Sequence, residues 1–109
     1  MQSSSTNILV LNTCPDRDVA ESISQQLVKQ KLAACINIVP GLTSVYEWQG
    51  QIQTDSEVLL LIKTQTSRYA ELEQQLLSLH PYELPEIITV SIDSGYPPYL
   101  NWLNSSLEQ

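Results

Sequence analysis

The seven residues from His80 to Glu86 hold the chain's only histidine together with Tyr82, Glu83 and two of its six prolines. Imidazole and carboxylate groups are ligands for divalent metals and partners in proton transfer. Each proline fixes its own φ and disfavours helical geometry in the residue before it, so this stretch is a stiff corner. A lone histidine beside carboxylates is half of a metal site or half of an acid–base pair. The alternative is a corner residue whose ring ties down a helix end.

The two cysteines, Cys14 and Cys35, lack the close spacing of a zinc or redox pair. Cys14 directly precedes a proline, where Thr13 or Cys14 is suited to cap a helix. It is either a small residue at that helix start or a ligand, and a helix N-terminus would favour its thiolate. Cys35 lies in an apolar strand pattern, so we expect it in the core.

Two further sets of side chains share strand faces by alternation. Glu57 and Lys63 lie on one face of a long strand and are either related through a neighbouring strand or independent charges. Tyr46 and Trp48 lie on one face near a turn. They either line a cleft between subunits or form a dry contact there.

Composition narrows the classes of function. A net charge of −7 disfavours nucleic acid and anionic membranes as partners, and no apolar run is long enough to span a bilayer. We expect a cytoplasmic protein with one domain over residues 1–109, in which residues 1–6 form a flexible leader. The sequence has no nucleophile–base–acid set and no phosphate loop, so we expect it not to be an enzyme.

Hydrophobic periodicity predicts the elements that position these residues. The first strand covers 8–11 and is followed by a helix that carries Val19, Ile23 and Leu27 on one stripe. Thr66 or Ser67 is expected to cap the second helix, which His80-Pro81 ends. Two further strands are expected at 33–48, with a bend at Pro40-Gly41, and at 51–64, after a turn at Gln49-Gly50. A fourth strand is expected at 86–92, with Ile88, Val90 and Ile92 facing the core. The last element is a helix at 99–104 that packs through Tyr99, Trp102 and Leu103.

The order β-α-β-β-α-β predicts an α+β fold, a ferredoxin-like sandwich with a short C-terminal helix. Two helices cover only one face of its four-stranded sheet, yet the first and third strands are apolar on both faces. The uncovered face would be a large apolar patch, so we expect the chain to associate with copies of itself.

Several segments in order resemble the CutA family, also called divalent-ion tolerance proteins. The resemblance covers about residues 8–107 and rests on Cys14-Pro15-Asp16, Leu32 to Gly41, Ser44 to Gly50, Glu57 with Ile62-Lys63-Thr64, His80 to Ile87, and Tyr99 to Leu103. It implies a compact homotrimer of ferredoxin-like subunits, similar to the PII signalling proteins. It also implies an association with divalent metals, copper above all. The recurring polar positions of the family that the resemblance assigns to this chain are Trp48, Glu57, Lys63, His80, Tyr82 and Glu86.

The resemblance leads to two hypotheses about the ligand. In the first, Cu²⁺ or another divalent cation binds near subunit clefts, with His80 as anchor and Cys14, Glu83 and Glu86 assisting, and with no organic cofactor. Because Leu79 stands before His80 where copper-binding members carry a second histidine, we expect this binding to be weak. In the second, the trimer is a signalling module that takes a small ligand or protein partner in a cleft lined by Trp48, Glu57, Lys63, Tyr82 and Glu86, with Lys63 holding an anion.

Overall fold

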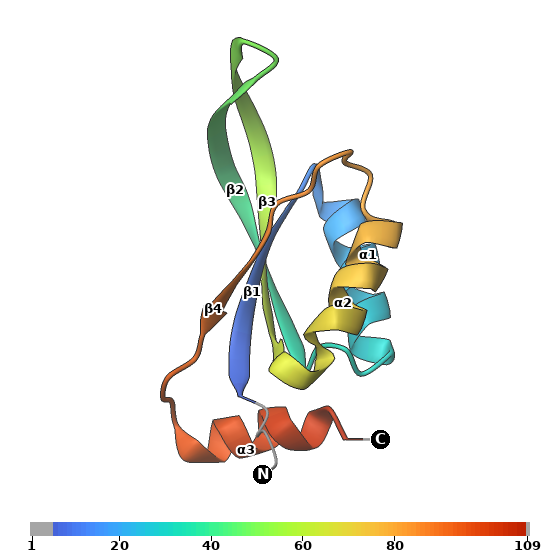
Figure 1. The fold of residues 1–109 in the computed structure, drawn as a ribbon, viewed down its shortest axis with the longest axis vertical. Coiled ribbons are helices and arrows are strands. Elements are labelled where there is room, and N and C mark those ends of the chain that lie inside the picture. Colours follow the sequence, from blue (N-terminus) through green and yellow to red (C-terminus); the bar gives the residue numbers. More distant parts are fainter. Residues whose placement is uncertain (1–5, 109) are drawn as a thin grey trace.

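The computed structural model describes residues 6–108, so the expected leader lies, apart from Thr6, outside the described residues. These residues form four strands and three helices in the predicted order (Figure 1). The elements are β1 (Asn7–Cys14), α1 (Arg17–Lys29), β2 (Cys35–Trp48), β3 (Gln51–Gln65), α2 (Thr66–Leu79), β4 (Ile87–Ser91) and α3 (Pro97–Ser106).

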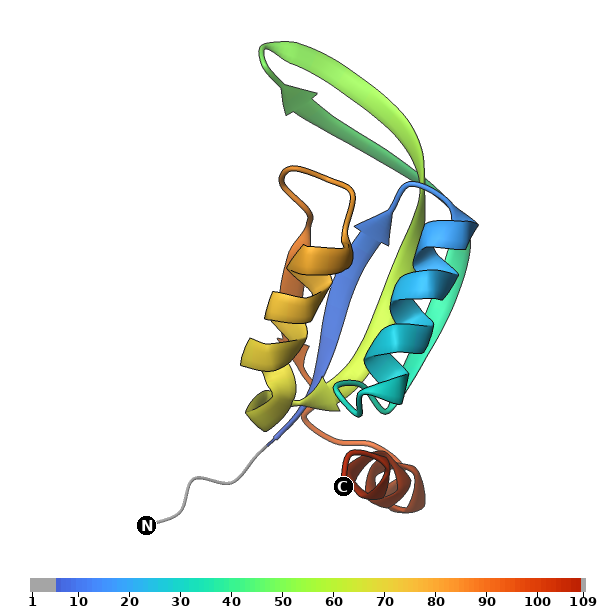
Figure 2. The same ribbon diagram turned by 90° about the vertical axis from the view of Figure 1, so that its right-hand side faces the viewer.

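The strands pair antiparallel in the order β2-β3-β1-β4, which is the ferredoxin-like arrangement. Figure 2 shows α1 and α2 side by side on one face of the sheet, while α3 lies across its lower end. The predicted α+β fold is therefore confirmed. Within residues 6–108 no helix is long and apolar enough to cross a membrane.

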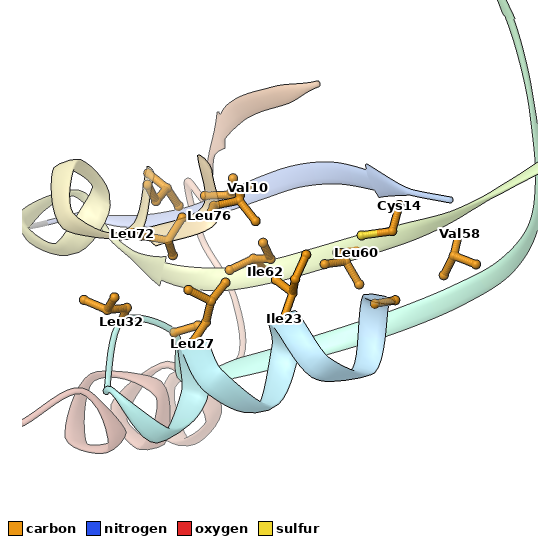
Figure 3. Close-up of a cluster of buried hydrophobic side chains, with 13 residues drawn as sticks. Val10, Cys14, Ile23, Leu27, Leu32, Val58, Leu60, Ile62, Leu72 and Leu76 are labelled. Atoms are coloured by element: carbon orange, nitrogen blue, oxygen red, sulfur yellow. The ribbon is translucent and has the colours of Figure 1, made fainter. Parts of the chain in front are cut away.

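The core lies between the sheet and these two helices (Figure 3). Alternate residues of β3, among them Leu60 and Ile62, face Ile23 and Leu27 of α1 and Leu72 and Leu76 of α2, and all six are at most 1% exposed. Burial of each such side chain contributes about 1.5–3 kcal/mol. This packing fixes the helical face of the sheet and leaves Leu59 and Leu61 half-buried on the other face, away from α1 and α2.

β2 and β3 continue past the end of β1 as a long hairpin arm, so that the molecule measures 48 × 26 × 25 Å. A bulge between Val39 and Leu42 bends β2, and Gly41 there has a φ of +82°. Gln49 and Gly50 close the arm with φ values of 54° and 80°, as a two-residue hairpin turn requires. The predicted bend and turn are both confirmed.

The predicted helix caps are wrong. β1 extends three residues past its predicted end and includes Thr13 and Cys14, so α1 is instead capped by Asp16, whose carboxylate accepts the Val19 N–H at 2.9 Å. Gln65 occupies the cap position of α2 and makes no side-chain cap bond, and its side-chain amide instead donates to Asn104 Oδ1 at 2.6 Å.

The predicted core face of the fourth strand is also wrong. Ile88 and Val90 are 51% and 48% exposed, whereas Ile87 packs against the core. The cause is the register with β1, which pairs Ile87 with Asn12 and Ile88 with Leu11, so Ile88 and Val90 face the uncovered side. In α3 only Leu103 is buried as predicted, and Tyr99 and Trp102 remain 39% and 49% exposed.

Candidate functional site

His80 fastens the corner to the end of β1. The residue is 8% exposed, its ring Nε2 lies 2.8 Å from the Thr13 carbonyl oxygen, and its Nδ1 accepts the backbone N–H of Tyr82 at 3.1 Å. A carbonyl only accepts and a backbone N–H only donates, so Nε2 is the donor to Thr13 and Nδ1 is the acceptor from Tyr82. Both nitrogens are therefore engaged in positioning the corner, and neither has a free lone pair for a metal.

Tyr82 holds the corner against the hairpin arm. Its hydroxyl donates to Glu57 Oε2 at 2.6 Å, and its ring lies 4.7 Å from the His80 ring between centroids. Burial, together with this hydrogen bond, raises the pKa of Tyr82, so the hydroxyl keeps its proton at neutral pH. Glu57 is only 8% exposed, although it lies beyond the last pair of β1 and β3.

Cys14 is a core residue. Its side chain is fully buried, and its sulfur donates to Asn12 Oδ1 at 3.4 Å. Burial, with the negative charges of Glu57 and Asp16, raises the pKa of the thiol to about 12. The expectation that the helix N-terminus favours its thiolate is therefore wrong, because burial and these two carboxylates outweigh the helix dipole.

A groove of about 620 Å³ lies between the hairpin arm and the corner. Figure 2 shows the arm curving over the loop that joins α2 and β4. The groove is lined by four acidic side chains, Asp55, Glu57, Glu83 and Glu86, and by three aromatic ones, Tyr46, Trp48 and Tyr82. Of its described lining residues none is basic, so its field is negative throughout.

The structure brings together only part of each predicted site. Trp48, Glu57 and Tyr82 line the groove as the cleft hypothesis requires, whereas Lys63 does not. Glu83 and Glu86 also line it, whereas His80 and Cys14 do not. Across residues 6–108 no three histidine, cysteine or acidic side chains are grouped so as to hold a metal ion.

Lys63 lies near the end of β3, six residues beyond Glu57. Its Nζ donates to Asn37 Oδ1 and lies 3.8 Å from the sulfur of Cys35. Cys35 is the residue of β2 that pairs with Lys63 of β3 in the sheet. Six residues along a strand span roughly 20 Å, so Glu57 and Lys63 are independent charges. Cys35 is only partly buried, and the expectation of a core position is wrong because its side chain lies on the uncovered face.

Two residues of the site were missed by the sequence analysis. Asp55 lines the groove and accepts a hydrogen bond from Tyr46. Its position two residues before Glu57 on the same strand face was the signal that could have revealed it. Asn12 is fully buried and donates from Nδ2 to the Glu86 carbonyl oxygen at 2.9 Å, which a polar residue inside an apolar strand could have suggested.

The strand order, the crossover helices and this acidic groove define an α+β protein of the ferredoxin-like class with a site at the end of its sheet. The chain belongs to the CutA1 divalent ion tolerance protein family, whose model matches residues 8–106. The resemblance read from the sequence is thereby confirmed.

Individual relatives agree with this assignment. The chain is 50% identical over 91 residues to a CutA homolog of Xenopus laevis, covering 84% of this chain and 60% of that protein. It is 48% identical over 98 residues to the divalent-cation tolerance protein CutA of Thermus thermophilus, covering 90% and 95%. The crystal structure of CutA from Xylella fastidiosa is 45% identical, has a TM-score of 0.92 and covers 94% and 99% of the two chains.

The relatives are named for different cell compartments, and some of them are longer than this chain. A relative from Arabidopsis thaliana is named chloroplastic, and a structure from Archaeoglobus fulgidus is described as periplasmic. The chain spans only 60% and 54% of the length of its Xenopus laevis and Mus musculus relatives.

Proposed function

We propose that this chain is a cytoplasmic, homotrimeric binding protein, and not an enzyme, that contributes to tolerance of divalent metal ions. The observation that carries the proposal is the groove, where four carboxylates face one space with no basic residue among its described lining. Such a field concentrates cations and repels anions. The family description, divalent ion tolerance protein, agrees with a cation as the ligand.

The uncovered face of the sheet supports self-association in a PII-like trimer. Val39, Ile88 and Val90 are 40%, 51% and 48% exposed on that face, and the half-buried Leu9, Leu11, Leu59 and Leu61 lie between them. Contiguous apolar surface of this kind is covered by a partner in stable soluble proteins. A copy of the same chain supplies that cover, and the hairpin arm extends far enough beyond β1 to reach it.

A divalent ion fits the groove better than it fits the predicted centre at His80 and Cys14. The histidine nitrogens and the cysteine thiol are committed to hydrogen bonds, and a tight site with three or more ligands is absent from the described part of a single chain. Glu83 and Glu86 are exposed and line the groove. Weak binding of Cu²⁺ or a similar ion by these two carboxylates, completed by a neighbouring copy, is the form of the proposal that fits the geometry.

Thermal unfolding with added CuCl₂ tests this proposal. A ligand that binds only the folded state raises the unfolding temperature by mass action, so Cu²⁺ should raise it in the wild type and not in the double variant Glu83→Gln, Glu86→Gln. The control is Glu71→Gln plus Glu73→Gln, which removes two exposed charges of α2 outside the groove. His80→Ala distinguishes the two sets of metal ligands. If Cu²⁺ fails to raise the unfolding temperature in this variant alone, the metal ligand is His80 and not the pair of carboxylates.

The aromatic lining favours a second candidate function, a PII-like module that takes a small ligand or protein partner. Trp48 and Tyr46 remain 40% and 43% exposed at the groove, which is unusual for large aromatic side chains without a partner. Lys63 lies outside the groove, so the anion anchor of the original cleft hypothesis has no counterpart in it. A shift in unfolding temperature that survives a chelator supports this function, and the absence of any such ligand contradicts it.

A further inference from the structure

We infer that Lys63 determines how copies of this chain fit together, because its ammonium group pairs with a carboxylate of the neighbouring copy. The inference deepens the proposed self-association and rests on it. Three observations carry it: the place of this single charge on the uncovered face of the sheet, the contacts that its own chain provides, and the excess of acidic residues in the sequence.

Lys63 is a lone charge in the apolar part of the uncovered face. In the sheet it pairs with Cys35 on one side and with Leu9 on the other, and Leu9 pairs with Val90. The next row across the same face consists of Asn37, Leu61, Leu11 and Ile88. Of the eight residues in these two rows, only Lys63 carries a charge, so contact between copies at this place involves one ammonium group among aliphatic side chains.

The chain itself satisfies this ammonium group only in part. Its Nζ donates to Asn37 Oδ1, which is neutral, and lies 3.8 Å from the Cys35 sulfur, which is a weak acceptor. Across residues 6–108 no carboxylate lies within ion-pair distance of it. An ammonium group has three N–H donors, so the half-buried Lys63 leaves donors and its whole charge to the solvent of the single chain.

Covering the face changes the surroundings of this charge. A sister chain that packs on the aliphatic side chains withdraws water from Lys63, and an ammonium group without water is costly unless a partner compensates its charge. A neutral acceptor leaves the charge uncompensated, whereas a carboxylate removes it. The chain has 12 acidic residues against 5 basic ones, so a second copy offers mostly carboxylates as charged partners.

This pairing gives the assembly its specificity. Aliphatic surfaces fit one another in several registers, since contact between them has no direction. An arrangement that leaves Lys63 without a carboxylate carries the cost of an unpaired charge, and such arrangements are therefore excluded. The apolar residues of the face supply the tendency to associate, and Lys63 selects the one arrangement of copies that forms.

The variant Lys63→Met tests this inference, because two explanations predict opposite signs. Methionine is apolar, so association through apolar burial alone should become tighter. If a carboxylate of the sister chain pairs with Lys63, methionine leaves that carboxylate buried alone, and the concentration at which half of the assembly dissociates should rise at least about tenfold. Fluorescence-detected sedimentation of labelled protein over a dilution series measures this concentration, and circular dichroism shows that the variant is folded.

Two further variants make the test specific. Lys29→Met removes an exposed lysine of α1 and should leave the dissociation concentration unchanged. Lys63→Arg keeps the positive charge and should remain closer to the wild type than Lys63→Met. For a wild type that stays assembled at the lowest concentration, the rate of subunit exchange between two differently labelled pools should rise at least about tenfold in Lys63→Met.

The possible failures are distinguishable. A tighter or unchanged assembly in a folded Lys63→Met variant would overturn the inference while leaving self-association in place. Equal weakening by Lys29→Met would overturn it as well, because the effect would then come from net charge and not from this position. A Lys63→Arg variant as weak as Lys63→Met would overturn the charge pairing. A wild-type chain that sediments as a single subunit would contradict the proposed self-association itself.

Discussion

His80 positions the corner through hydrogen bonds and has no free ring nitrogen for a metal ion. The sequence offered it as a metal ligand or as a corner residue, and its two hydrogen bonds, to Thr13 and from Tyr82, connect the corner to the end of β1. The corner then presents Tyr82 to Glu57 and places Glu83 on the groove. The residue types at the site were visible in the sequence. Their partners were not, because each bond joins segments at least 25 positions apart or depends on the chain's path at the corner.

Removal of the Tyr82 hydroxyl should destabilise the fold. Tyr82→Phe leaves the buried Glu57 carboxylate without its hydrogen-bond donor, so the free energy of unfolding should fall by about 1–3 kcal/mol. Urea denaturation measures this change. Tyr96→Phe, at a position 73% exposed, is the control and should change stability by less than about 0.5 kcal/mol. Equal effects of the two variants would show that the Tyr82–Glu57 bond contributes nothing.

The buried Cys14 thiol should make the fold sensitive to alkali. Its pKa rises from the ordinary 9.0 to about 12 on folding, so the unfolded state loses this proton first. Stability is therefore complete below pH 9.0 and falls as the pH rises toward 12. Between pH 9 and 10, below the ordinary tyrosine pKa of 10.0, the thiol dominates this loss. The free energy of unfolding of Cys14→Ala should be flatter than that of the wild type in this interval; parallel curves would contradict the assignment.

At the scale of elements, structural features that depend on the residues of one strand or one turn were predictable. Features that depend on how two strands pair were not. Alternation along β3 and the Gln49-Gly50 turn predicted the hairpin arm from local chemistry. β4 is apolar at successive positions, so its register with β1, and with it the exposure of Ile88, was not determined by its own sequence. The groove depends on the Val39–Leu42 bulge and on the corner together, which no single segment encodes.

The cap of α1 offers a test at this scale. Asp16→Ala removes the side-chain acceptor of the Val19 N–H and should lower the free energy of unfolding by about 0.5–2 kcal/mol. Asp18→Ala is a matched control: it also removes an acidic side chain near the start of α1, but this residue is not the cap. Thermal unfolding of both variants compares them directly. A larger loss in Asp18→Ala would mean that the helix dipole, and not the cap, dominates this end.

For the whole molecule, the two faces of the sheet determine how the protein behaves in solution. One face is covered by α1 and α2, and the other presents Val39, Ile88 and Val90 with no cover from within the described chain. Self-association would bury this face and bring the acidic grooves next to neighbouring copies. The proposed ligand sites therefore depend on assembly as well as on the fold of one chain.

A charge on the uncovered face should weaken the assembly. Ile88→Lys places an ammonium group on a surface that the proposal buries, so its oligomer should dissociate at concentrations where the wild type remains assembled. Leu77→Lys, at a position 51% exposed on α2, is the matched control and should leave the oligomer intact. Size-exclusion chromatography with light scattering measures both. Dissociation of the Leu77 variant instead would place the interface on the helical side.

Sedimentation velocity of the wild-type chain tests the central claim most directly. If sister chains cover the open sheet face, the protein sediments as a single species of three times the 12.3 kDa mass of one chain. A stable, folded species of 12.3 kDa across the micromolar range would contradict this account.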